Sequence, residues 1–151
     1  MNLSTPSQPH AADLERLVRF FEQLSPADLR CIDALYAPHA RFKDPFNEVQ
    51  GVAAIEQIFR HMFESLHEPR FVVTQRMLQG REAFLCWEFV FRFKSFRSQQ
   101  PQTIRGATHL RFDDQGRVEL HRDYWDAAEE LYEKLPLVGG LMRWLKRLVN
   151  S

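Results

Sequence analysis

The 151-residue sequence has few features of a secreted, membrane-spanning or nucleic-acid-binding protein. It has only two cysteines, which do not make a disulfide framework, and we interpret Cys31 and Cys86 as buried free thiols because both lie in apolar patterns. Lys and Arg balance Asp and Glu at 20 each, so there is no basic surplus to suggest a nucleic-acid partner. No apolar run reaches the roughly 18 residues of a transmembrane helix. The first residues are polar and lack a secretory signal, and we expect a cytoplasmic protein.

Phenylalanine, in contrast, is abundant, with 13 residues in a chain that is 44% apolar. The length suits one domain, and the apolar content is enough to fill its core. So many Phe rings leave two alternatives open. The rings either fill the core or line a cavity within it.

The N-terminal half has helical periodicity. After an arm over residues 1–10 that we expect to be disordered, apolar residues between positions 14 and 24 recur with the spacing of one helix face. Residues 25–28, Ser-Pro-Ala-Asp, are typical of the start of a second helix. The longest and most regular pattern predicts a third helix over residues 52–66.

After position 69 the apolar period changes to two, which indicates strands. The pattern predicts strands near 71–79 and at 84–94, 103–112 and 118–125. In the second of these, apolar residues occupy one face: Leu85, Trp87, Phe89, Phe91 and Phe93. Helices followed by a meander of strands predict an α+β fold. We expect a curved antiparallel sheet packed against three N-terminal helices, in one domain over residues 11–126.

A C-terminal helical extension is expected over residues 127–151. One face of its second part is apolar and the other is basic, with Leu137, Leu141, Leu145 and Leu148 opposed to Arg143, Lys146 and Arg147. Such a helix can lie on a membrane surface. We favour packing on the domain or on a dimer partner, because three cations on a short helix are few for a membrane anchor.

The segment from Tyr36 to Phe46, Y-A-P-H-A-R-F-K-D-P-F, carries the clearest motif, and Gly51 with an apolar helix follows it. This pattern resembles the ketosteroid isomerase and SnoaL-like polyketide cyclase group of the nuclear-transport-factor-2-like superfamily. A second similar block, R-F-D-D-Q-G-R-V, precedes Tyr124 and Trp125. The resemblance spans residues 11–126 and implies a cone-shaped fold, the cystatin-like α+β barrel, with an apolar pocket.

The resemblance also implies a changed catalytic set. Asp44 matches the proton-transferring base of the isomerases. Phe20 stands where they have an oxyanion-hole tyrosine, and Thr108 stands where they have an aspartic acid. Losing the tyrosine is expected to remove about 2.7–4 kcal/mol of oxyanion stabilisation, as at other oxyanion holes. In the last strand the isomerase pattern points alternate residues into the pocket, and here these are His121 and Asp123.

We therefore predict three catalytic residues. Asp44 is the base, His121 donates to the developing oxyanion, and Asp123 orients His121. The expected substrate-binding residues are Phe20, Tyr36, Phe59, Met62, Trp87, Phe89, Thr108 and Trp125. No pair of histidines has a zinc-binding spacing, so we expect no metal, and nothing points to a cofactor. Each residue has a structural alternative, and Asp44 before Pro45 can simply cap a turn.

Two functions remain open. The first is a cofactor-independent enzyme that moves a proton on a flat, apolar carbonyl compound, in an isomerisation or cyclisation. The alternative is a non-catalytic module that holds an apolar ligand in the cone or a partner on the sheet. Polar groups buried in the cavity favour the enzyme, because burial without a purpose costs free energy. We also expect a homodimer through the outer sheet face, with Glu88, Val90, Arg92, His109 and Arg111.

Overall fold

The structure is a computed structural model that describes residues 8–94, 98–132 and 136–149. Its helices are α1 (Ala11–Glu22), the 3-10 helix η1 (Pro26–Ala34), α2 (Val52–Ser65), α3 (Ala127–Glu130) and α4 (Pro136–Val149). Its strands are β1 (Tyr36–Lys43), β2 (Glu48–Gln50), β3 (Leu66–Gln79), β4 (Glu82–Phe93), β5 (Gln102–Phe112) and β6 (Val118–Tyr124). Most of the arm expected to be disordered, residues 1–7, lies outside the described residues.

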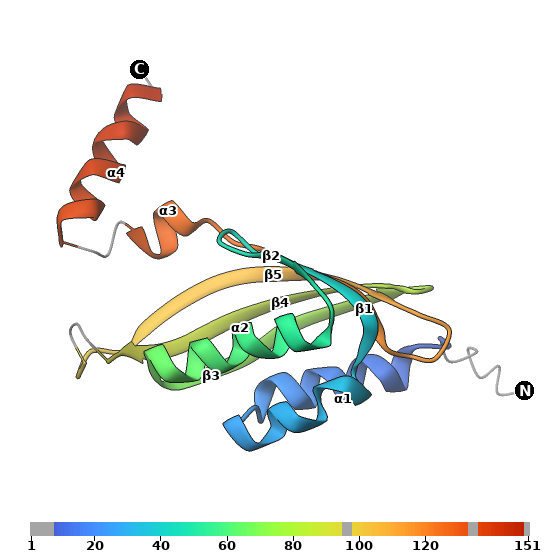
Figure 1. Cartoon of the computed structure of the whole chain (residues 1–151). Helices are drawn as coiled ribbons and strands as arrows, with labels where there is room; N and C mark the ends of the chain where they lie inside the picture. The colour runs from blue at the N-terminus through green and yellow to red at the C-terminus, as the bar shows by residue number, and fades with distance from the viewer. Residues whose placement is uncertain (1–7, 95–97, 133–135, 150–151) are drawn as a thin grey trace, which may run out of the picture.

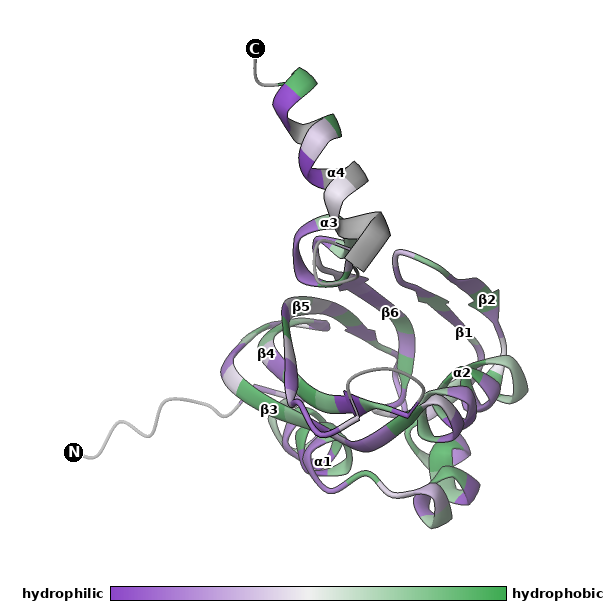
Figure 2. Cartoon of the chain, turned by 90° about the vertical axis from the view of Figure 1, so that its left-hand side faces the viewer, coloured by the Kyte–Doolittle hydropathy of each residue, from purple (hydrophilic) through white to green (hydrophobic). Residues whose placement is uncertain are grey.

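The six strands form one sheet in the order β2-β1-β6-β5-β4-β3. The sheet is strongly curved, and α1 and α2 lie on its concave side (Figure 1). Figure 2 shows how β1 and β2 form one side of the curved wall and β3 the other. This arrangement confirms the predicted α+β cone. One detail of the prediction is wrong, because β1 runs parallel to β6 and the sheet is mixed rather than antiparallel throughout.

The helices bury the faces that their sequence periodicity predicts. In α1 the buried residues are Leu14, Leu17, Val18 and Phe21. In α2, Ile55 and Phe59 reach the core. The second helix begins where residues 25–28 predict it. There the Asp28 carboxylate accepts hydrogen bonds from the Ser25 amide at 3.1 Å and from its hydroxyl at 2.7 Å. This helix is of the 3-10 type and connects α1 to the sheet.

The long strands give the sheet one apolar and one mixed face. In β4 the predicted inward residues Leu85, Trp87, Phe89 and Phe91 are buried. The strand β3 begins at Leu66, earlier than expected, and its register with β4 shifts between His67 and Arg70. Within that shift Glu68 has a φ of 49°, so the strand absorbs Pro69 in an irregular step.

The predicted thiol burial is wrong for Cys31. Both cysteines are free, but Cys31 is exposed and Cys86 is half-buried. The helix η1 turns Leu29 and Ile32 into the core, which leaves Cys31 on its outer side. Cys86 lies between the buried residues Leu85 and Trp87 of β4, so strand alternation places it on the outer sheet face.

The C-terminal extension contains two helices. The Glu130 carboxylate is buried and holds α3 against β5, since it accepts hydrogen bonds from the Arg105 amide at 3.4 Å and the Arg105 Nε at 3.3 Å.

Figures 1 and 2 show α4 projecting away from the sheet, so the expected packing on the domain is not seen. Its exposed apolar residues include Trp144, Leu148 and Val149. The end of the predicted first helix, residues 133–135, lies outside the described residues, as do the side chains of Leu137, Leu141 and Lys146. Among the described residues, no helix has the length and apolarity to cross a membrane.

Candidate active site

The concave face of the sheet and α2 enclose a cavity of about 400 Å³. A cavity of this size accommodates a small organic molecule. Nine aromatic side chains line it: Phe42, Phe46, Phe59, Phe71, Trp87, Phe89, Phe91, Phe93 and Trp125. The Phe residues therefore both fill the core and line a cavity, because several of these rings belong to the core and also form the cavity wall.

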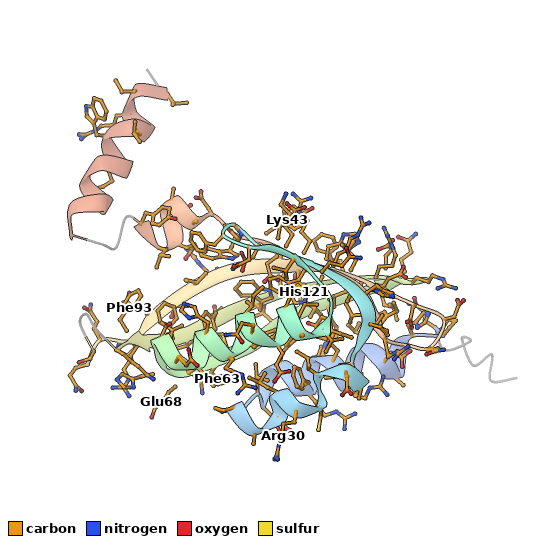
Figure 3. The ribbon with its side chains drawn as sticks, viewed as in Figure 1. Arg30, Lys43, Phe63, Glu68, Phe93 and His121 are labelled. Atoms are coloured by element: carbon orange, nitrogen blue, oxygen red, sulfur yellow. The ribbon has the colours of Figure 1, made fainter. Side chains whose placement is uncertain are left out.

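A chain of hydrogen bonds runs through the inner wall of this cavity. The Tyr36 hydroxyl lies 2.8 Å from Nδ1 of His121, and Nε2 of His121 lies 2.7 Å from Oδ1 of Asp123. The Thr108 hydroxyl donates to the same Oδ1 at 2.6 Å. The indole N–H of Trp87 in turn donates to the Thr108 hydroxyl at 2.7 Å. In Figure 3, His121 lies beneath β1, on the side of the sheet that carries α2.

The environment of Tyr36 keeps its hydroxyl protonated. Full burial, with a smaller contribution from the charge of Asp123, holds the pKa of Tyr36 well above its usual value of 10.0. The phenol can therefore donate its proton to Nδ1 of His121. In the His121 tautomer that accepts this bond, Nε2 carries the ring proton and donates it to Asp123. Rings of Phe21, Phe42 and Tyr36 surround the imidazole at centroid distances of 4.5 to 6.0 Å.

Asp123 is the carboxylate that these bonds position. Its Oδ1 accepts the hydrogen bonds from Thr108 and His121, whereas its Oδ2 has no hydrogen bond to any residue that the structure describes. The side chain retains 17% exposure, and it lines the main cavity. It also borders a small pocket of about 20 Å³ beneath the cavity, next to Phe21, Thr108 and His121. One oxygen of a fixed carboxylate is thus available to a ligand.

Asp44 lines the same cavity from the end of β1, but its carboxylate also caps a turn. Its Oδ1 accepts the amide protons of Phe46 at 2.8 Å and Asn47 at 2.6 Å, and the Asn47 side-chain amide approaches both of its oxygens at 3.1 and 3.2 Å. In the parallel pairing of β1 with β6, the last two residues that lie opposite each other are Lys43 and Arg122. Asp44 is the next residue after Lys43, and Asp123 is the next residue after Arg122. The two carboxylates therefore lie at the same end of the cavity.

Most of the predicted site residues do line the cavity or the pocket beneath it. Phe59, Met62, Trp87, Phe89, Trp125 and both aspartates line the main cavity, while Thr108 and His121 line the small pocket. Tyr36 is fully buried behind His121 and is joined to the site by its hydrogen bond with that ring. Phe20 is misplaced, because the helical phase of α1 turns Phe21 inward and leaves Phe20 beside a surface hollow with Arg16 and Arg19.

The arrangement of His121 differs from the expected one. Both of its ring nitrogens are engaged, with Tyr36 and Asp123, so neither is directed at a ligand in the main cavity. Direct donation from His121 to an oxyanion therefore does not fit this geometry. Its Nε2 instead holds Oδ1 of Asp123 in place.

Several wall residues were not among the predicted substrate-binding residues. Phe91 and Phe93 lie on the predicted apolar face of β4, and that signal was sufficient to include them. Phe42, Phe71 and Leu131 carry no comparable signal, because their place in the wall depends on how β1, β3 and α3 fold around the cavity. Within the described ranges, no three His, Cys, Asp or Glu side chains gather as a metal site would require.

The family comparison agrees with the fold and with the motif at Tyr36. The family model described as SnoaL-like domain matches residues 17–121. The chain belongs to the SnoaL-like domain family. No curated protein matches it.

Solved structures share the fold of this SnoaL-like chain at low sequence identity. A candidate SnoaL-like polyketide cyclase from Jannaschia sp. CCS1 is 17% identical, with 83% of this chain and 91% of that chain covered and a TM-score of 0.69. A hypothetical protein from Catenulispora acidiphila with a ketosteroid isomerase-like fold, solved in complex with trimethylamine, is 14% identical, with coverages of 83% and 92% and a TM-score of 0.68. An NTF2-like protein of unknown function from Burkholderia pseudomallei is 18% identical, with coverages of 80% and 92% and a TM-score of 0.67.

Proposed function

We propose that this SnoaL-like protein is a cofactor-independent enzyme that transfers a proton on a small apolar carbonyl compound, in an isomerisation or cyclisation. The observation that carries the proposal is the positioned carboxylate of Asp123. It has one oxygen fixed by Thr108 and His121 and the other available at the wall of an aromatic cavity. Aromatic walls favour a flat, apolar ligand.

In the proposed reaction, Oδ2 of Asp123 removes a proton from the carbon next to the carbonyl group. The electron pair of the broken C–H bond moves into the carbonyl, whose oxygen gains negative charge. The indole N–H of Trp125 is a donor on the same wall and makes no hydrogen bond to any described residue, so it is available to that oxygen. The protonated Asp123 then returns the proton to another carbon of the conjugated system.

The resemblance to ketosteroid isomerases implies a rival assignment, in which Asp44 is the base. The turn bonds of Asp44 occupy its Oδ1 with two backbone amides, and the Asn47 side-chain amide lies near both oxygens. Asp123 has hydrogen bonds on Oδ1 only, so its Oδ2 can accept a proton from a ligand more readily than either oxygen of Asp44 can. We therefore assign the proton transfer to Asp123 and a binding role to Asp44.

The two assignments are separated by comparing Asp123→Asn with Asp44→Asn. The probe is a β,γ-unsaturated decalone, whose conversion to the conjugated enone is followed by absorbance. We expect Asp123→Asn to lower the rate by about 10²-fold or more, the usual contribution of a general base, and Asp44→Asn to retain turnover. The opposite pattern would make Asp44 the base.

One observation favours the alternative of a non-catalytic binding module. The inward residue of α1 is Phe21, which offers no donor in place of the tyrosine, and both nitrogens of His121 are engaged. Trp125 is therefore the donor on which the oxyanion depends. If calorimetry detects binding of apolar ketones while neither isomerisation nor deuterium exchange from solvent occurs, the module is the correct function.

We also propose that the protein forms a homodimer through the outer face of the sheet. That face carries exposed apolar side chains, with Met77 at 58% and Phe84 at 38% exposure. Beside them lies a charged cluster, in which Glu82 pairs with Arg111 at 2.8 Å and with His109 at 2.5 Å. Hydrogen bonds from Arg111, and to a smaller extent from His109, lower the pKa of Glu82.

A further inference from the structure

The charges that line the cavity are of one sign. Its two charged residues in the described part of the chain are the carboxylates Asp44 and Asp123, and no Lys or Arg belongs to its lining there. The nearest cations along the chain are turned elsewhere. Lys43 lies 3.8 Å from Glu48, and Figure 3 shows it above the sheet, on the side opposite His121.

Arg122 is likewise turned away from the cavity interior. Its guanidinium lies over the Tyr124 ring, 4.7 Å from the centroid, and together with Lys43 it borders a hollow on the outside. Asp44 and Asp123 border that outside hollow as well, but neither carboxylate forms an ion pair with a Lys or Arg of the described residues. An anionic ligand would meet two like charges in a partly desolvated space, which is strongly unfavourable.

The aromatic rings of the cavity also favour a cationic ligand over an anionic one. Phe46 and Trp125 pack edge to face at 5.6 Å near the two carboxylates, and Phe42 lies on β1 two residues before Asp44. The face of an aromatic ring carries negative charge and attracts an organic cation, while its surface still accommodates apolar groups. A ligand with an apolar body and a protonated amine satisfies both the rings and the carboxylates.

We propose that the cavity selects apolar compounds that carry a basic amine, and that Asp44 anchors the ammonium group. The proposal rests on the proposed function for the use of this cavity and names its substrate class. It also gives the two carboxylates different roles. Asp44, held in its turn by Phe46 and Asn47, recognises the ligand, and Asp123 exchanges the proton.

The test uses three probes of one shape: adamantylmethylamine, adamantylmethanol and adamantanecarboxylate. Their binding to the full chain is measured by calorimetry and by the fluorescence of Trp87 and Trp125, in a Trp144→Phe background that removes the signal of α4. We expect the amine to bind at least about tenfold more tightly than the alcohol, as a charge-assisted contact would provide. The carboxylate is expected to show no measurable binding.

The decisive variant is Asp44→Asn, since an Asn side chain can still accept the amide protons of Phe46 and Asn47. It should lower the affinity for the amine by about tenfold and leave the affinity for the alcohol unchanged. Asp113→Asn is the matched control. Asp113 accepts the amides of Gln115 and Arg117, both at 2.9 Å, in a turn that does not line the cavity.

A second control, His61→Gln, removes the remaining titratable side chain of the lining and should leave the ranking of the probes unchanged. Equal affinities for amine and alcohol, or tightest binding of the carboxylate, would overturn the inference. These outcomes leave the proposed function standing, because the cavity still binds an apolar body. Absence of binding by all three probes would count against the cavity as a ligand site and so against both proposals.

Should Asp44→Asn fail to fold, the ranking of the three probes on the wild-type chain decides the question by itself. Raising the salt concentration provides a further readout. Added salt should lower the affinity for the amine more than the affinity for the alcohol, because salt screens only the charged contact.

Discussion

At the scale of single residues, Tyr36 has the contact that is easiest to isolate. Its ring is fully buried, and its hydroxyl forms a hydrogen bond with Nδ1 of His121. Tyr36→Phe keeps the ring and leaves that nitrogen without a partner, which should cost about 1–3 kcal/mol of the free energy of unfolding. Urea unfolding measures the loss. Tyr124→Phe, at a position that is 46% exposed, is the control and should change stability by less than about 0.5 kcal/mol.

The same hydroxyl predicts a pH dependence. The pKa of Tyr36 is well above 10.0 in the folded chain, whereas in the unfolded chain the phenol ionises near its usual value. The stabilising effect is therefore complete below about pH 10 and is lost as the pH rises beyond it, by up to about 1.4 kcal/mol per pH unit. The stability gap between wild type and Tyr36→Phe should shrink between about pH 9 and pH 11. A gap that stays constant over this range would show that the phenol ionises equally in both states.

At the scale of secondary-structure elements, Gly106 of β5 provides room for the cavity wall. It pairs with Trp87 of β4, and a Cβ at this position would lie 2.5 Å from the Trp87 ring and 3.0 Å from Cβ of Trp125. Gly106→Ala should therefore displace both indoles, destabilise the chain by about 1–3 kcal/mol and weaken ligand binding. Denaturant unfolding and near-ultraviolet circular dichroism would report the two effects.

The matched control is Gly140→Ala in α4, where an added Cβ meets no atom of the described residues within 4 Å, its own helix backbone aside. It should stabilise the chain slightly or not at all, since Ala is the better helix former. If Gly106→Ala leaves the aromatic dichroism and the stability unchanged, the close approach of Trp87 to β5 is not a constraint on the cavity.

The sequence allowed prediction of those elements whose stability comes from a regular apolar face. Helix α2 and strand β4 end within two residues of their expected bounds, because Ile55, Phe59 and the alternating rings of β4 mark one buried side. The second helix was placed correctly by Ser25 and Asp28, although periodicity does not distinguish a 3-10 helix from an α-helix.

Contacts between distant segments could not be predicted in this way. The parallel pairing of β1 with β6, and with it the bond from Tyr36 to His121, depends on how the whole sheet closes. Phe21, and not Phe20, points inward from α1. The two residues are neighbours on the helix, and an ungapped alignment does not resolve which of them faces the core. For Asp44 the sequence offered both a turn and a site, and the structure shows that its carboxylate caps the turn at the edge of the cavity.

At the scale of the whole molecule, the outer sheet face predicts self-association. Phe84 stacks on His109 at 5.4 Å and stays partly exposed on that face. Phe84→Asp would place a charge in the proposed two-fold interface and should convert the dimer to a monomer in sedimentation velocity. Arg30→Glu, on the exposed side of η1, changes charge by two units without touching the sheet and should leave the dimer intact. A wild-type chain that sediments as a monomer at micromolar concentration would contradict the prediction.

The pairing of β1 with β6 has a consequence for how the protein is made. A ribosome releases β1 early, but the partner for its inner edge leaves the exit tunnel only after β3, β4 and β5 have been synthesised. Tyr36 and His121, which are 85 residues apart, meet only at that stage. Contacts of such long range form late and slow the search for the native state. An incomplete polypeptide that stops before β6 therefore lacks Asp123 and its support, so the proposed proton transfer requires the synthesis of β6.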